Sequence, residues 1–237
     1  MASPSKGIII PTLREHHNLK RLIPVIFQHV PDARILISDD HSQDGTNELA
    51  GERVTVLDRV ADHGYGKSVL EGFRFAMLQG FDYIVTMDAD FSHNPQSIPD
   101  MLRGLGEADV VIGSRYVAGG GIANWNLRRR LLSRFANWYV RRLLGVQFRD
   151  GTTGFVAYRR SAIQALVDAA PRSEGYSFLV ECKYILEQAG FRISEVPIIF
   201  QDRVEGTSKM SWRVIWESIW LPWRLRFFPK KANISKA

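Results

Sequence analysis

The chain has 237 residues, of which 45% are hydrophobic and 24% charged, so it has enough apolar material for a complete globular core. Its single cysteine, Cys182, excludes an intrachain disulfide and a cysteine-based zinc site. The formal net charge is +6 and the arginine clusters lie after the midpoint, so we expect an anionic partner: nucleic acid, phospholipid or a phosphorylated substrate. We expect neither a signal peptide nor a spanning helix, because the apolar runs are too short.

The first half of the chain alternates short apolar runs with amphipathic segments. We expect strands at residues 7–11, 34–38, 53–57, 83–87 and 109–112, and helices at residues 18–30 and from the glycines at 64–66 to about 79. This alternation is typical of a parallel, doubly wound α/β sheet, whose ligands bind at the carboxyl ends of the strands. Polar groups follow three of the expected strands: Asp39 with Asp40, Asp88 with Asp90, and Ser114 with Arg115. Their shared placement predicts a site at that edge.

The alternation stops after Arg115. Three glycines at residues 119–121 suggest a flexible joint, and residues 127–144 read as a basic helix. We expect an extended segment at 148–158 with a turn at Asp150 and Gly151, a helix at 178–188 and a last strand at 192–200. The polar residues 202–210 form a loop long enough to act as a mobile lid.

The C-terminal segment, residues 211–228, carries a stripe of aromatic residues. Trp212, Trp216, Trp220, Trp223 and Phe227 follow one another at intervals of three or four residues, which places them on one face of a helix. Tryptophan beside arginine and lysine is typical of a helix lying in a membrane interface. The alternative is a terminal helix packed on the core or on a second subunit, and a proline at 222 would kink or end it.

Residues 81–95 carry the strongest chemical signal. Asp88 and Asp90 follow a short buried strand, and their charges repel each other unless a cation lies between them. Carboxylate oxygens suit Mg²⁺ or Mn²⁺, and those cations suit a ligand diphosphate. A solvated surface turn is the alternative.

Three functions compete for these features. Gly66, Lys67 and Ser68 suggest a nucleotide triphosphatase, but the phosphate-binding loop would need glycine at Ala61, and Asp62 beside it has the wrong charge. Nucleic-acid binding would fit the charge, but no familiar module is present and the aromatic residues gather at one end. Sugar transfer from a nucleoside diphosphate uses every feature: acids for base and ribose, a cation site for the diphosphate, and arginines for an anionic acceptor.

The motif residues resemble the family 2 glycosyltransferases with the GT-A fold, and among them the dolichol-phosphate (polyprenol-phosphate) mannose synthases. The resemblance extends from about residue 7 to about 228 and rests on residues 11–19, 39–46, 64–67, 87–95, 113–116, 125–137, 150–155 and 200–210. The first motif departs from the family pattern, because Leu13 and Arg14 replace the usual tyrosine and asparagine. Ser92 stands where some members use glutamine as a third metal ligand.

The resemblance implies a role for each matched residue. The guanosine part of GDP-mannose would be held by Pro11, Leu13, Glu15, Ser38 and Asp40. The diphosphate and the metal, Mg²⁺ or Mn²⁺, would be held by Asp88, Ala89 and Asp90, with Ser92 as a further metal ligand. The lipid phosphate would be held by Arg115, Arg129 and Ser133, while Arg203 and Lys209 would close over the donor.

The implied reaction needs no catalytic base. A polyprenyl or dolichyl phosphate is ionised near pH 7, so it can attack the anomeric carbon directly and invert it to a β-linked product. Asp150 is a candidate acid or base, although a turn-forming role is the simpler interpretation, and His93 is expected to be a structural hydrogen-bonding residue. Of the arginine run, we expect Arg129 to face the pocket, with Arg128 and Arg130 left to lipid headgroups or solvent.

We therefore expect a catalytic domain at residues 1–210, with a nucleotide-sugar half at 1–116 and an acceptor half with a mobile loop at 117–210, followed by a membrane-interface helix and basic tail at 211–237. The expected location is the cytoplasmic face of a membrane, either the endoplasmic reticulum or a prokaryotic plasma membrane. A small membrane-anchoring subunit is a candidate partner, and nucleic acid is not. Two alternatives stay open: a UDP-sugar donor such as UDP-glucose, and a catalytically inactive binding or scaffold protein.

Overall fold

The structure, a computed structural model, describes residues 4–202 and 212–227. Residues 203–211, which include Arg203 and Lys209 of the expected lid, and the tail at 228–237 lie outside the described residues. The strands are β1 Lys6–Thr12, β2 Ala33–Asp39, β3 Val54–Asp58, β4 Tyr83–Thr86, β5 Val110–Ser114, β6 Gly121–Ile122, β7 Val156–Arg159, β8 Ile193–Pro197 and β9 Ile199–Phe200. The α-helices are α1 His16–His29, α2 Tyr65–Gln79, α3 Ile98–Gly104, α4 Leu127–Leu144, α5 Arg160–Ala169, α6 Gly175–Gln188 and α7 Trp212–Phe227.

The main sheet has seven strands in the order β3-β2-β1-β4-β7-β5-β8. The five expected strands are all present and lie in it, which confirms the α/β class. The sheet is mostly parallel, as expected for the GT-A fold, and β7 runs antiparallel between β4 and β5. The loop after α4 brings the chain to the carboxyl edge of the sheet, so β7 enters from that edge without a crossover helix. This insertion places residues 150–155 beside the ends of β4 and β5.

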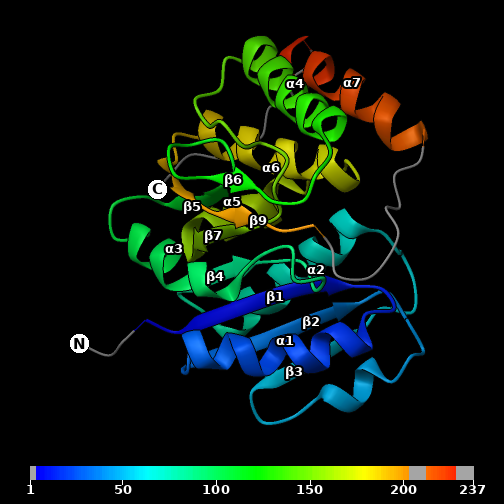
Figure 1. Cartoon of the computed structure of the whole chain (residues 1–237). Helices are drawn as coiled ribbons and strands as arrows, with labels where there is room; N and C mark the ends of the chain where they lie inside the picture. The colour runs from blue at the N-terminus through cyan, green and yellow to red at the C-terminus, as the bar shows by residue number, and fades with distance from the viewer. Residues whose placement is uncertain (1–3, 203–211, 228–237) are drawn as a thin grey trace.

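Helices cover both faces of the sheet (Figure 1). Ile8 and Ile10 point to the side covered by α1 and α3, whereas Ile9 points to the side covered by α2, α5 and α6. The alternation follows from the strand geometry, since successive side chains leave opposite faces. Both faces are buried, which explains the nearly unbroken apolar sequence of β1.

The acceptor half contains more and shorter elements than expected. The predicted last strand at 192–200 is two strands, β8 in the main sheet and β9, which pairs with β6 in a separate two-stranded sheet. The glycine run at 119–121 is therefore not a simple joint: it forms a turn and opens β6, and a Cβ on Gly120 would lie 2.6 Å from the Ser114 carbonyl oxygen. Only the end of the predicted extended segment is a strand, and helices α3 and α5 were not predicted.

Helices α4 and α7 lie side by side at the end of the molecule opposite β3 (Figure 1). The Tyr139 hydroxyl on α4 donates a hydrogen bond to the Ile219 carbonyl on α7 at 2.8 Å. Leu221 and Leu225 pack into the core, while Trp220 stays 65% exposed. Helix α7 thus packs on the protein with one side and presents aromatic side chains on another. Among the described residues, no helix combines the length and the hydropathy needed to cross a membrane.

Candidate active site

The carboxyl ends of β1 and β2 form the first part of the site. The Asp40 backbone N–H donates to the Thr12 carbonyl at 3.0 Å, which joins the two strand ends. The buried Asp40 carboxylate forms an ion pair with Arg59 and accepts from the Gly64 backbone N–H at 2.7 Å. Asp40 therefore anchors the loop that leads into α2, and Arg59 is a partner that the sequence did not reveal.

The other residues expected at the nucleotide end divide into two groups. Ser38 is fully buried, and its hydroxyl donates to the Ser68 carbonyl at 2.8 Å, so it holds α2 against β2. Pro11 is likewise buried within β1. Leu13 is exposed, and the Glu15 carboxylate accepts from the Asn18 side chain at 2.7 Å. Only the second group, in the loop after β1, offers side chains at the surface of this edge.

Asp88 and Asp90 follow β4 at the same edge of the sheet. The Asp88 backbone N–H donates to Nδ1 of His93 at 3.0 Å, and the His93 ring stacks on Phe155 with a centroid distance of 4.9 Å. Burial lowers the pKa of His93, although the neighbouring carboxylates oppose this, so the ring is neutral and its Nδ1 can accept. The structural role expected for His93 is confirmed.

The acidic pair fits a hard divalent cation. Asp88 is partly exposed and Asp90 is nearly buried, and the Ser92 backbone N–H donates to the Asp90 carboxylate at 3.1 Å. The buried Ser92 hydroxyl has no hydrogen-bond partner among the described residues. Within residues 4–202 and 212–227, no group of three or more histidine, cysteine or acidic side chains is arranged to hold a metal ion. An all-oxygen set of two carboxylates and a hydroxyl suits Mg²⁺ or Mn²⁺ that takes its remaining ligands from a diphosphate and water.

Arg115 lies beyond the end of β5 in a buried ion pair with Asp150. Its Nε and Nη2 donate to the two Asp150 carboxylate oxygens at 2.7 and 2.6 Å, and Nη2 also donates to the Thr152 hydroxyl at 2.8 Å. Burial would raise the pKa of Asp150, but Arg115 outweighs it and holds that pKa below its ordinary value. Asp150 is therefore a fixed carboxylate that orients Arg115, a role that the sequence did not predict, and the expected turn follows it at Gly151 and Thr152.

The loop at residues 150–154 connects Arg115 to the acidic pair. The buried Lys183 ammonium on α6 donates to the carbonyls of Gly151 and Thr153 at 3.0 and 2.8 Å. At its far end, the Gly154 carbonyl accepts from Thr86 on β4 at 2.7 Å. A Cβ on Gly154 would collide with the Tyr65 hydroxyl and lie 3.5 Å from the Asp88 carboxylate. The loop at residues 150–154 therefore contacts both Arg115 and the strand that carries the acidic pair, and so fixes their relative positions.

Arg129 and Ser133 on α4 have separate partners. The Arg129 guanidinium lies 3.9 Å from the Trp125 ring centroid and forms an ion pair with Asp202 at 2.9 Å. Ser133 accepts a hydrogen bond from the Tyr116 hydroxyl at 2.7 Å. Ser133 thus connects α4 to the loop after Arg115, whereas Arg129 is held by Asp202, which follows β9.

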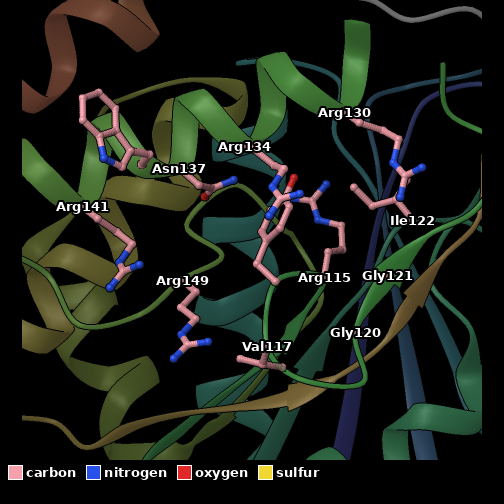
Figure 2. Close-up of a pocket in the computed structure, with 12 residues that line it drawn as sticks. Arg115, Val117, Gly120, Gly121, Ile122, Arg130, Arg134, Asn137, Arg141 and Arg149 are labelled. Atoms are coloured by element: carbon pink, nitrogen blue, oxygen red, sulfur yellow. The ribbon is translucent and has the colours of Figure 1, made fainter. Parts of the chain in front are cut away.

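A cavity of about 480 Å³ lies between α4 and the loop that follows β5 (Figure 2). None of the described residues that line it is acidic. Its polar lining consists mainly of Arg115, Arg130, Arg134, Asn137, Arg141 and Arg149. Arg129, which was expected to face the pocket, is not among the lining residues, whereas Arg130 is. A basic run in the sequence indicates only that some arginines face a pocket; the rotation of α4 selects which ones.

Comparison with known proteins agrees with this architecture. The profile of the family described as Glycosyl transferase family 2 matches residues 7–167. A polyprenol monophosphomannose synthase from Mycolicibacterium smegmatis is 41% identical over 212 residues, which cover 86% of this chain and 80% of the relative. An undecaprenyl-phosphate mannosyltransferase from Micrococcus luteus is 39% identical over 217 residues and covers 89% of each chain.

Two solved structures share the fold at low sequence identity. Glucosyl-3-phosphoglycerate synthase from Mycobacterium tuberculosis, in complex with Mn²⁺, UDP and glucosyl-3-phosphoglycerate, has a TM-score of 0.66 at 17% identity, with 99% of this chain and 82% of that chain covered. A mannosyltransferase from Pyrobaculum calidifontis, in complex with GDP-Man and Mn²⁺, has a TM-score of 0.62 at 14% identity, covering 98% and 66%. The family match and the two relatives at about 40% identity establish that the chain belongs to glycosyl transferase family 2 and is a glycosyltransferase with the GT-A fold.

Proposed function

We propose that this enzyme transfers mannose from GDP-mannose to a polyprenyl or dolichyl phosphate, with inversion at the anomeric carbon. The observation that carries the proposal is that one loop connects an acidic pair suited to a metal diphosphate with an arginine-lined cavity, and that no acid is among the described residues lining this cavity. An anionic acceptor fits such a cavity. The names of the two relatives at about 40% identity support mannose as the sugar and a polyprenyl phosphate as the acceptor.

The acceptor end positions a nucleophile that is already ionised. Arg115, with its plane fixed by Asp150, lines the cavity, and Arg130 lines it from α4. Ser133 borders the cavity through its hydrogen bond with Tyr116, which is a lining residue. These groups would hold the phosphate so that one of its oxygens faces the anomeric carbon. Burial of the ion pair excludes water from one side of Arg115, which strengthens its interaction with an anion.

The donor end would bind the nucleoside diphosphate along the carboxyl edge of β1, β2 and β4. Leu13 and Glu15 would contact the nucleoside, and Asp88 and Asp90 would hold a divalent cation with Ser92 nearby. When bound, the cation supplies Lewis-acid stabilisation of the departing diphosphate. The complexes of the two structural relatives with Mn²⁺ support Mn²⁺ or Mg²⁺, and the GDP-Man complex supports a guanosine donor.

We further propose that α4 and α7 seat the enzyme on the cytoplasmic face of a membrane. The two helices contact each other, and both expose large apolar side chains: Leu131, Phe135 and Trp138 on α4, and Trp220 and Trp223 on α7. Single exposed apolar residues are ordinary, but a contiguous group beside arginines suits a lipid interface. A small membrane-anchoring subunit would bind at the same surface.

The test is transfer from GDP-mannose to a short-chain polyprenyl phosphate in neutral detergent with Mn²⁺, with UDP-glucose as the competing donor. We expect β-linked mannosyl phosphate lipid from the parent enzyme and a loss of at least about 100-fold in Asp90→Ala, since metal stabilisation contributes several kcal/mol. Asp100→Ala, which removes an exposed carboxylate on α3, is the matched control and should keep full activity. Product from UDP-glucose alone would assign the other donor, and full activity of Asp90→Ala would refute the metal assignment.

A further inference from the structure

The arginine cavity carries more positive charge than one acceptor phosphate requires. Arg115 is already paired with Asp150, but Arg130, Arg134, Arg141 and Arg149 form no ion pair with any acidic residue in the described parts of the chain. These four residues are exposed, and several like charges around one cavity create a positive potential that attracts an anion. The acceptor phosphate, held by Arg115 and its neighbours, leaves most of these guanidiniums uncompensated.

Helix geometry gathers the extra arginines on one side. At about 100° per residue, Arg134 and Arg141 lie within about 40° of Arg130 around α4, and Asn137 lies about 20° to the other side of Arg130. Arg149 reaches the cavity from the loop after α4, as Figure 2 shows. Arg141 and Arg149 occupy the part of the cavity away from Arg130 and Ile122 (Figure 2).

The stripe next to these arginines on α4 is apolar and exposed. Leu131, Phe135 and Trp138 follow the arginine stripe around the helix, and each is more than half exposed. Trp138 also lines the cavity, so the arginines and the apolar stripe share a border. A soluble phosphate would gain nothing from that border, whereas a phospholipid could place its headgroup on the arginines and its acyl chains along the stripe.

We propose that Arg134, Arg141 and Arg149 form a second anionic site, which binds the phosphate of a membrane phospholipid headgroup beside the acceptor. The inference rests on the proposed membrane location and extends it, because it gives the docked enzyme a specific lipid contact in addition to general surface attraction. The site would hold α4 at the bilayer surface with the cavity open towards the acceptor lipid.

The test compares Arg141→Gln with Arg142→Gln. Both residues are exposed, in the last turn of α4, and carry the same charge, but only Arg141 lines the cavity. Binding is measured by co-sedimentation with vesicles of equal parts phosphatidylglycerol and phosphatidylcholine, and with phosphatidylcholine alone. We expect Arg141→Gln and Arg149→Gln each to weaken binding to the anionic vesicles by roughly 10- to 100-fold, as expected for loss of a charge-assisted hydrogen bond. Arg142→Gln should weaken it by about fivefold or less.

Three outcomes would overturn the inference. If Arg141→Gln and Arg142→Gln weakened binding to the anionic vesicles equally, the binding would depend on diffuse surface charge. If Arg141→Gln weakened binding to neutral and anionic vesicles equally, the cavity would hold no site for an anionic headgroup. If Arg141→Gln and Arg149→Gln raised the KM for the acceptor in detergent but bound vesicles as the parent does, these arginines would belong to the acceptor site. Failure of the proposed function looks different, because the parent enzyme would then transfer no mannose while the contrast between the two variants persisted.

Discussion

Replacement of Asp150 by asparagine should separate the structural and functional roles of the buried ion pair. Asp150 is fully buried and Arg115 almost so, and the Asp150 carboxylate accepts three hydrogen bonds from Arg115, including one from its backbone N–H at 3.0 Å. Asparagine has nearly the same shape but no charge. Its NH2 group would replace one carboxylate oxygen and would face an N–H group of Arg115, which cannot accept a hydrogen bond. The substitution therefore leaves a guanidinium buried without its counter-charge.

Removal of one partner from a buried pair costs about 3–5 kcal/mol. For a chain of this length we expect the melting temperature to fall by roughly 6–10 °C. The pKa of Asp150 lies below its usual 3.8, so its contribution is complete above that value and is lost as the pH falls through the lower value of the folded protein. The difference in stability between parent and variant should be constant from neutral pH to about 4 and shrink only below it.

The assay is thermal unfolding together with transfer activity. The double variant Asp150→Leu with Arg115→Met removes both charges, so it should recover most of the lost stability without recovering activity. Asp100→Asn is the control, because its ion pair with Arg103 is exposed and should contribute less than about 1 kcal/mol. A single Asp150→Asn variant that melts within about 2 °C of the parent would refute the reasoning. So would a double variant with normal turnover.

Three further predictions concern the loop, its buried lysine and the membrane surface. Burial lowers the pKa of Lys183 to about 8 from its usual 10.5, so between these values only the unfolded chain keeps the proton. The stability of the parent relative to Lys183→Met, measured by urea unfolding, should therefore rise by roughly 3 kcal/mol across that range. Gly154→Ala would push a Cβ against the Tyr65 hydroxyl and should lower kcat by roughly 10-fold or more, as steady-state kinetics would show. Trp220→Ala should weaken vesicle binding by roughly 10-fold, measured by co-sedimentation.

Each of these predictions has a matched comparison or a contradicting result. Gly51→Ala adds a methyl group where no atom lies within 4 Å, so it should leave kcat unchanged. Leu78→Ala removes a side chain that is 84% exposed on α2, outside the α4 and α7 surface, and should leave vesicle binding unchanged. Stability that does not change between pH 8 and 10.5 relative to Lys183→Met would contradict the buried-lysine argument.

The features that the sequence predicted well are local. Helix α4 begins and ends at the predicted residues because the Asn126 side chain accepts from the Arg129 backbone N–H at the first turn and Gly145 adopts the left-handed conformation after the last. The polar groups after β2, β4 and β5 were correctly placed at one edge, because parallel strands share their carboxyl ends. Such signals depend on residues a few positions apart, which a sequence displays directly.

The remaining features depend on contacts between distant residues. Asp150 is 35 residues from Arg115, and nothing near it in the sequence distinguishes a buried counter-ion from a turn residue. Lys183 looks like any helical lysine until α6 packs beneath the loop and three carbonyls surround its ammonium. The sequence by itself determined the positions of the strands in the nucleotide half, the acidic pair and the basic character of α4. Only the tertiary structure decided the reversal of β7 and which arginines face the cavity, because side-chain burial and partners are set by the packing of elements that meet only in the folded chain.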